Sequence, residues 1–122
     1  MKLKNLLLAT VFLLGMGTAF GQAPQKFNYQ AVARDASNNV MPTTLVGIEI
    51  VIHQTTPGGT IVYSETHTAI TSAIGLMNLS IGAGTVTAGS FAAIDWGAGP
   101  YYLEIGMDPA GGTTFTSMGT QQ

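Results

Sequence analysis

The sequence predicts an all-β fold, an antiparallel β-sandwich of six or seven strands, from three observations. Apolar residues recur at every second position in several stretches, as on the buried face of a half-exposed strand. These stretches are rich in Ile, Val, Thr and Tyr, which favour strands. Turn-forming residues separate them, with no helical segment between. Two such sheets packed face to face have the general shape of an immunoglobulin-like or transthyretin-like domain.

Residues 1–21 have the layout of a secretory signal peptide. Two lysines precede an apolar run, and small residues stand before a predicted cut at Gln22. The apolar run, of about 14 residues, is shorter than the roughly 20 that cross a bilayer. We therefore expect an exported protein, secreted or on the outer cell surface. Its mature chain, residues 22–122, is expected to form the β-sandwich domain and to have no membrane span.

The first three strands are predicted at 27–34, 46–53 and 60–71. The second is the most regular, with four aliphatic residues on one face: Val46, Ile48, Ile50 and Ile52. Its other face carries Gly47, Glu49 and His53. The first and third strands alternate less regularly.

The remaining strands are predicted at 76–81, 101–107 and 113–118. Met77, Leu79 and Ile81 share one face of the first of these, and the second repeats the pattern with Tyr101, Leu103, Ile105 and Met107. The glycine-rich stretch 82–89 lacks the lysine and the spacing of a phosphate-binding loop, so it is interpreted as a connection. Because 113–118 resembles a strand that has only begun, we expect the sequence to be a fragment or the front module of a longer protein, truncated at its C-terminus.

Composition excludes several classes of protein. The 122 residues include ten charged side chains and no cysteine, which excludes disulfide scaffolds, zinc sites with thiolate ligands and cysteine nucleophiles. The mature chain has two basic residues, Lys26 and Arg34, against six acidic ones, a formal side-chain charge of −4. Such a chain has no electrostatic reason to bind nucleic acid or anionic membranes.

Few side-chain groups suggest catalysis or metal binding. If their strands pair, His53 and His67 could bind a metal together with Glu65 or Glu49, but two exposed polar residues on a solvated face are the favoured interpretation. Glu49, Glu65 and Glu104 fall on predicted outward positions, while Asp35 and Asp108 fall in turns, where side chains cap backbone groups. We expect no enzyme activity, no metal site and no cofactor.

Aromatic residues suggest one candidate ligand site. On an open face, Phe91, Trp96 and Tyr102 could stack on the rings of a sugar. The favoured interpretation is that Phe91 and Trp96 close one end of the core, where a large ring buries much area.

Four segments resemble an N-terminal module of exported surface proteins of the Bacteroidetes type. The most distinctive is F-N-Y-Q-A-V-A-R-D at 27–35, and the others lie at 62–67, 75–82 and 94–96. In that family the module follows a signal peptide and precedes long fibrous regions that are often like tail fibres. The resemblance covers nearly all of residues 22–122. It implies an architecture and a location and assigns no catalytic residue.

These observations predict a non-catalytic structural or adhesive module of a cell-surface or fibre-like protein. Its expected partners are other surface proteins or copies of itself, joined through unpaired sheet edges. A carbohydrate-binding module that uses the exposed aromatics is the alternative, with glycans as partners, and a secreted hydrolase comes third.

Overall fold

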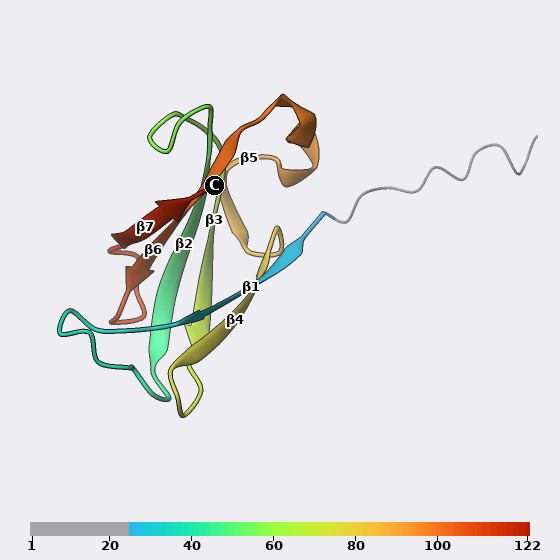
Figure 1. The fold of residues 1–122 in the computed structure, drawn as a ribbon. Helices are drawn as coiled ribbons and strands as arrows, with labels where there is room; N and C mark the ends of the chain where they lie inside the picture. The colour runs from blue at the N-terminus through green and yellow to red at the C-terminus, as the bar shows by residue number, and fades with distance from the viewer. Residues whose placement is uncertain (1–24) are drawn as a thin grey trace, which may run out of the picture.

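The computed structural model describes residues 25–122, whose strands form two antiparallel sheets packed as a β-sandwich (Figure 1). The predicted signal peptide lies outside these residues. The strands are β1 (Phe27–Val32), β2 (Leu45–Gln54), β3 (Thr60–Ile70), β4 (Leu76–Ile81), β5 (Thr85–Gly89), β6 (Tyr101–Asp108) and β7 (Thr116–Gln121). Two short 3-10 helices, Phe91–Ala93 and Trp96–Ala98, connect β5 to β6. The all-β prediction is therefore confirmed.

The larger sheet has the strand order β5-β3-β2-β6-β7, with β2 at its centre. Ile50 pairs with Glu65 of β3 on one side and with Ile105 of β6 on the other. The predicted alternation in β2 is confirmed, because Val46, Ile48, Ile50 and Ile52 are all buried on the inner face. Their aliphatic side chains supply the centre of the core.

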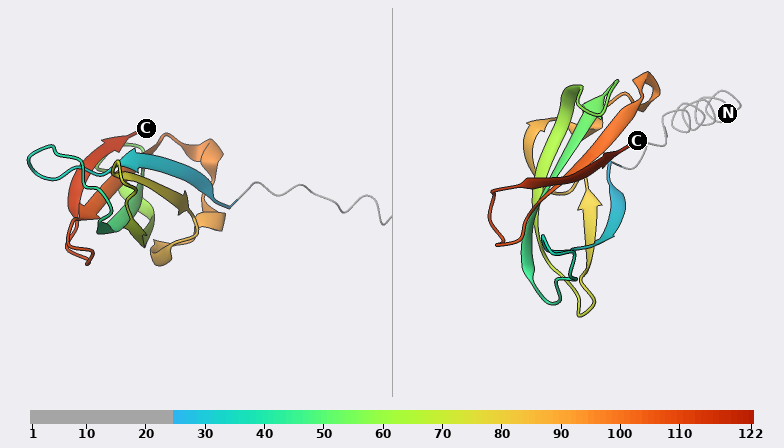
Figure 2. Two further views of the ribbon diagram at one scale, coloured as in Figure 1. Left: turned by 90° about the horizontal axis from the view of Figure 1, so that it is seen from below. Right: turned by 60° about the vertical axis from the view of Figure 1, so that its left-hand side comes forward.

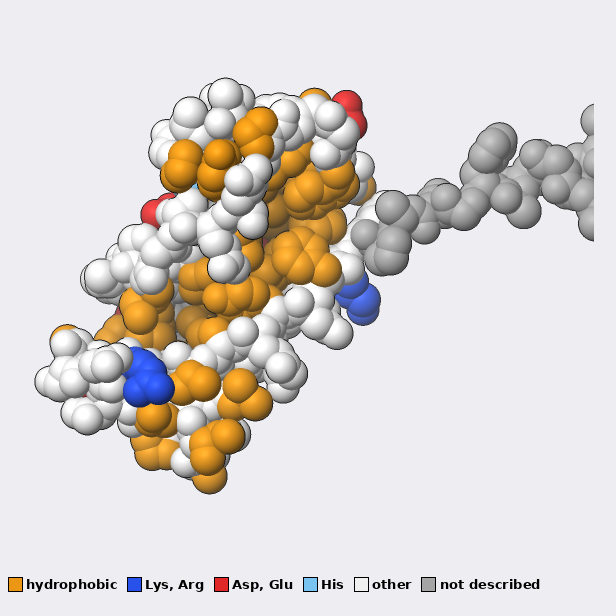
Figure 3. All heavy atoms as spheres, viewed as in Figure 1, with side chains coloured by type: hydrophobic (Ala, Val, Ile, Leu, Met, Phe, Trp, Pro, Cys, Tyr) orange, Lys and Arg blue, Asp and Glu red, His pale blue; other side chains and the backbone are white. Residues whose placement is uncertain are grey.

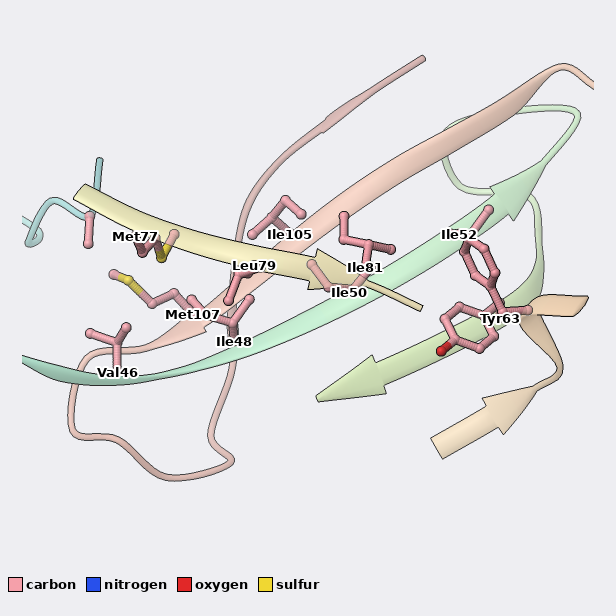
Figure 4. Packing of buried hydrophobic residues seen from close by; sticks show 12 residues of the cluster. Val46, Ile48, Ile50, Ile52, Tyr63, Met77, Leu79, Ile81, Ile105 and Met107 are labelled. Carbon is pink, nitrogen blue, oxygen red and sulfur yellow. The ribbon is translucent and has the colours of Figure 1, made fainter. Parts of the chain in front are cut away.

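The smaller sheet contains only β1 and β4, which pair with Phe27 opposite Ile81 and Val32 opposite Leu76. Met77, Leu79 and Ile81 of β4 are buried, as their alternation predicts. Figure 4 shows these side chains pointing toward those of β2 and β6. The core is therefore a layer between the two sheets, and Figure 2 shows both sheets from the side.

The interpretation of 82–89 as no more than a glycine-rich connection is wrong, because residues 85–89 form β5 along β3. Every residue of β5 is exposed, so the segment has no buried face that would produce an apolar alternation. Backbone pairing with β3 forms this strand, and backbone pairing leaves no such signal in the sequence.

The last strand lies later than predicted, at 116–121 instead of 113–118. Residues 113–115 belong to the loop that returns from β6, and this loop lies against the outer face of β2 and β6. A Cβ atom on Gly47 would overlap the carbonyl oxygen of Gly112, so the loop approaches β2 more closely than a side chain would allow. Phe115 lies close to Gly106, where an added Cβ atom would be 3.1 Å from the Cβ atom of Phe115.

Within residues 25–122, no helix has the length and apolar character needed to cross a membrane.

Candidate functional site: an open groove between the sheets

The two sheets of the sandwich are unequal, since two strands face five. Strand β1 pairs only with β4, and β7 pairs only with β6, so each is the edge of its sheet. Residues of both edges line one cavity of about 330 Å³, which places the two edges on the same side of the sandwich. We call this space the edge groove.

The edge groove has an apolar floor and uncharged walls. Its floor consists of core residues from both sheets: Met77, Leu103, Ile105 and Met107. One wall consists of Tyr29, Ala31 and Val32 of β1 with the following Ala33, and the other consists of β7 residues 118–121. Met118 is 52% exposed, and no charged side chain lines the groove. Figure 3 shows this surface as a hollowed band of hydrophobic side chains across the molecule.

The backbone of β1 supplies the polar part of the site. The Ala33 N–H donates to the Gly75 carbonyl at 2.8 Å. This bond shows which residues of the strand have backbone groups directed toward β4. The backbone N–H and C=O groups of successive residues in an antiparallel strand point alternately to its two sides. Tyr29 and Ala31 therefore direct their N–H and C=O groups toward β4. Asn28, Gln30 and Val32 direct their N–H and C=O groups away from it. Since β1 has no strand partner on that side among residues 25–122, these groups form an open edge.

An aromatic pocket of about 270 Å³ adjoins the groove and shares Tyr29, Leu103 and Gln121 with it. Trp96 is 48% exposed there, and its ring meets those of Phe91 and Tyr101 edge-on at 5.6 and 5.3 Å between centroids. Of the three predicted sugar-binding residues, Trp96 and Tyr102 both line this pocket. The third, Phe91, is buried and packs under the exposed indole.

The prediction that Glu65 points outward is wrong. The side chain lies on the inner face of β3 and is fully buried. Its Oε1 accepts from the Gly82 N–H at 2.8 Å, and its Oε2 accepts from the Gly84 N–H at 2.7 Å. The Tyr63 hydroxyl also donates to Oε2, at 2.9 Å, and His67 Nε2 lies 3.1 Å from Oε1. We call these five residues the Glu65 cluster.

The Glu65 cluster holds an ionised carboxylate inside the protein. Burial alone would raise the pKa of Glu65, but the Gly82 hydrogen bond, His67, and the bonds from Gly84 and Tyr63 lower it below its ordinary value. Burial, together with the neighbouring carboxylate, raises the pKa of Tyr63 to about 12. The bonded glycines lie on the connection from β4 in one sheet to β5 in the other. Glu65 therefore ties the two sheets together.

The two histidines do not form a shared site. His67 pairs with Ile48 and faces inward, whereas His53 lies on the outer face of β2. The metal hypothesis for this pair is therefore wrong, since the sheet separates the two rings. The favoured alternative of two exposed residues is also wrong. His53 is 7% exposed and contacts Gly59 O and Glu104, and the side chain of His67 is 12% exposed. No group of three or more His, Cys, Asp or Glu side chains able to hold a metal occurs in residues 25–122.

The side chains of Asp35 and Asp108 accept backbone hydrogen bonds as predicted, although Asp108 is the last residue of β6 and does not lie in a turn. One oxygen of Asp35 accepts from the N–H groups of Ser37 and Asn39, both at 2.9 Å. Asp108 accepts from Ala110 and Thr114. Both side chains cap loop backbone groups, which explains why Asp residues occur at these positions.

Sequence reasoning missed the edge groove and the Glu65 cluster for different reasons. In β3, polar residues occupy both faces around Glu65, so the alternation does not reveal which face is buried. Gly82 and Gly84 were the only sequence signal for this cluster. Because glycine has no side chain, its backbone N–H group can come close to a carboxylate on a neighbouring strand. The groove depends on which strands are edges, and strand order is not visible in a local pattern.

Comparison with known proteins gives one family match. A family model described as a domain of unknown function (DUF8740) matches residues 28–119. The matched segment begins in β1 and ends in β7, so it includes the β1 wall of the edge groove and the first half of the β7 wall. No curated protein and no solved structure matches the chain.

Proposed function

The chain belongs to DUF8740, a family of domains of unknown function, and from the shape of this domain we propose that it is a non-catalytic module that assembles with other proteins. It accepts an extended segment of a partner in the edge groove. The observation that carries this proposal is the coincidence of an open β1 edge with an apolar floor between the sheets.

Strand addition needs both parts of this arrangement. The free N–H and C=O groups of a sheet edge supply hydrogen bonds to the backbone of an incoming segment, and pockets beneath the edge receive alternate side chains. The open groups of Asn28, Gln30 and Val32 provide the first part. Met77, Leu103, Ile105 and Met107 provide the second. A strand laid there would widen the smaller sheet and cover the groove floor, where Leu103 is now partly exposed.

We further propose that the protein is exported and serves as a structural or adhesive module at the cell surface or in a fibre-like protein. The signal-like residues 1–21 support export, and the resemblance of 27–35 to surface modules supports this location. Carbohydrate binding is a second candidate because Trp96 and Tyr102 line one pocket and Trp96 is half-exposed. Its indole is available to stack on a sugar ring.

The variant Gln30→Pro tests strand addition. Proline removes the open N–H of residue 30 and leaves the bonds of Tyr29 and Ala31 to β4 in place, because proline is tolerated on the free side of an edge strand. We expect at least a tenfold loss of affinity for an alternating valine–threonine peptide fused to a soluble carrier, measured by fluorescence anisotropy. The matched control Gln30→Ala keeps the N–H and should bind like the wild type. Equal binding by the proline and alanine variants would contradict the proposal.

A further inference from the structure

The basic residues of the described chain lie at the two ends of β1. Residues 25–122 contain six acidic side chains but only two basic ones, Lys26 and Arg34. Lys26 immediately precedes β1 and Arg34 follows its end by two residues. In Figure 3 the two blue side chains lie at opposite ends of the hydrophobic band. A net acidic domain therefore places all the positive charge of its described part beside the edge groove.

The two charges also lie on the same face of the strand. Residues 26 and 34 are eight positions apart, and an even spacing in a strand keeps side chains on one side. Both are exposed, as are Asn28, Gln30 and Val32, whereas Tyr29, Ala31 and Ala33 are more buried and line the groove. In an extended chain the two positions are about 26 Å apart.

Both charges are available to a partner. Both side chains are exposed, and neither forms an ion pair with a carboxylate within residues 25–122. The Arg34 guanidinium donates one bond, at 3.1 Å, to the backbone carbonyl of Asn38, which is neutral. The hydrogen bond orients the guanidinium and leaves its charge unbalanced.

On the basis of the strand-accepting function proposed above, we propose that the partner is an alternately apolar strand with an uncharged centre and an acidic residue at each end. Residues opposite each other in neighbouring strands share a face. In a nine-residue strand, the second, fourth, sixth and eighth side chains therefore face the groove floor, opposite residues 27, 29, 31 and 33. The first and ninth lie opposite Lys26 and Arg34, where a carboxylate is attracted.

The same charges disfavour a second copy of this chain as the occupant. If two β1 strands pair antiparallel about Gln30, Lys26 of one copy lies opposite Arg34 of the other. Parallel pairing in register places each cation opposite its equivalent. Like charges directly opposite each other are destabilising in a sheet, so the partner is a different segment.

The test compares three nine-residue peptides with the same alternating valine–threonine centre and with glutamate, glutamine or lysine at both ends, each fused to a soluble carrier. A single exposed ion pair contributes little to the binding free energy. Replacing glutamate with lysine at both ends of the peptide turns two attractive contacts into two repulsive ones, and the two differences add up. We expect the glutamate peptide to bind about tenfold more tightly than the lysine peptide at low salt, with the glutamine peptide between them. The difference should shrink in 1 M salt, where charges are screened within about 3 Å.

The charge-reversed double variant Lys26→Glu/Arg34→Glu should reverse the order of the three peptides, since both positions are exposed to a bound strand. Equal affinity of the three peptides for the wild type would overturn the acidic-end proposal and leave strand addition standing. No binding of any peptide would overturn both. A dimer of the protein alone that Gln30→Pro abolishes would assign the edge to a second copy and overturn the proposed partner.

Discussion

Replacing Glu65 with alanine is expected to lower the free energy of unfolding by about 3–5 kcal/mol, the cost of breaking a buried charged network. The variant leaves the N–H groups of Gly82 and Gly84 and the Tyr63 hydroxyl without their acceptor inside the protein. Each unsatisfied buried group costs about 1–3 kcal/mol. The connection between β4 and β5 also loses its tie to β3. Urea unfolding at neutral pH measures the loss.

The matched control is Glu49→Ala on β2. Glu49 is a half-buried residue on the outer face of the same sheet, and its replacement should change the stability by less than about 1 kcal/mol. Comparable losses in the two variants would contradict the buried position of Glu65 and restore the outward orientation that the sequence suggests.

The pH dependence of stability provides a second readout for Glu65. Its pKa is lowered in the folded protein, so the unfolded chain binds the proton more tightly. The stabilisation is therefore present above the unfolded pKa, about 4.3 for Glu, and is lost as the pH falls through the lower folded pKa. Glu104 and Asp108 also have lowered pKa values and contribute to the acid sensitivity. The wild type should lose more stability below about pH 4 than the Glu65→Gln variant does. The difference between these two losses gives the contribution of Glu65 to the acid sensitivity.

Replacing Ile50 with alanine is expected to cost about 2–5 kcal/mol, because the side chain is fully enclosed at the centre of β2 and its loss leaves a cavity. Leu103→Ala should cost only about 1 kcal/mol, because Leu103 is partly buried on the floor of the edge groove and leaves no closed cavity. The pattern of alternation alone does not separate these two residues, since both occupy inward positions. Urea unfolding measures the loss of unfolding free energy in each variant. Equal losses in the two variants would contradict an open groove.

Local patterns predicted the strands that have one buried and one exposed face. In β2 and β4, aliphatic residues recur at every second position because only one face of each strand enters the core. Strand β5 was missed and β7 was misplaced because all their residues are exposed. Backbone pairing with β3 and β6 determines their positions, and side-chain patterns carry little of that information.

The candidate site depends on contacts between distant segments. Strand β1 is an edge because it pairs with β4, about fifty residues later, and with no other strand of the described chain. Lys26 and Arg34 are visible in the sequence as the two basic residues of 25–122, but their relation to a groove requires that edge. The inward orientation of Glu65 likewise depends on the approach of the connection between β4 and β5.

Amide hydrogen exchange along β1 tests most directly whether this strand is an open edge that accepts a partner. In the free protein, the N–H groups of Gln30 and Val32 should exchange at least tenfold faster than those of Tyr29 and Ala31, which are directed toward β4. When the glutamate-ended peptide saturates the groove, all four should exchange slowly. Uniform protection in the free protein, or no slowing of Gln30 and Val32 with peptide bound, would contradict the account.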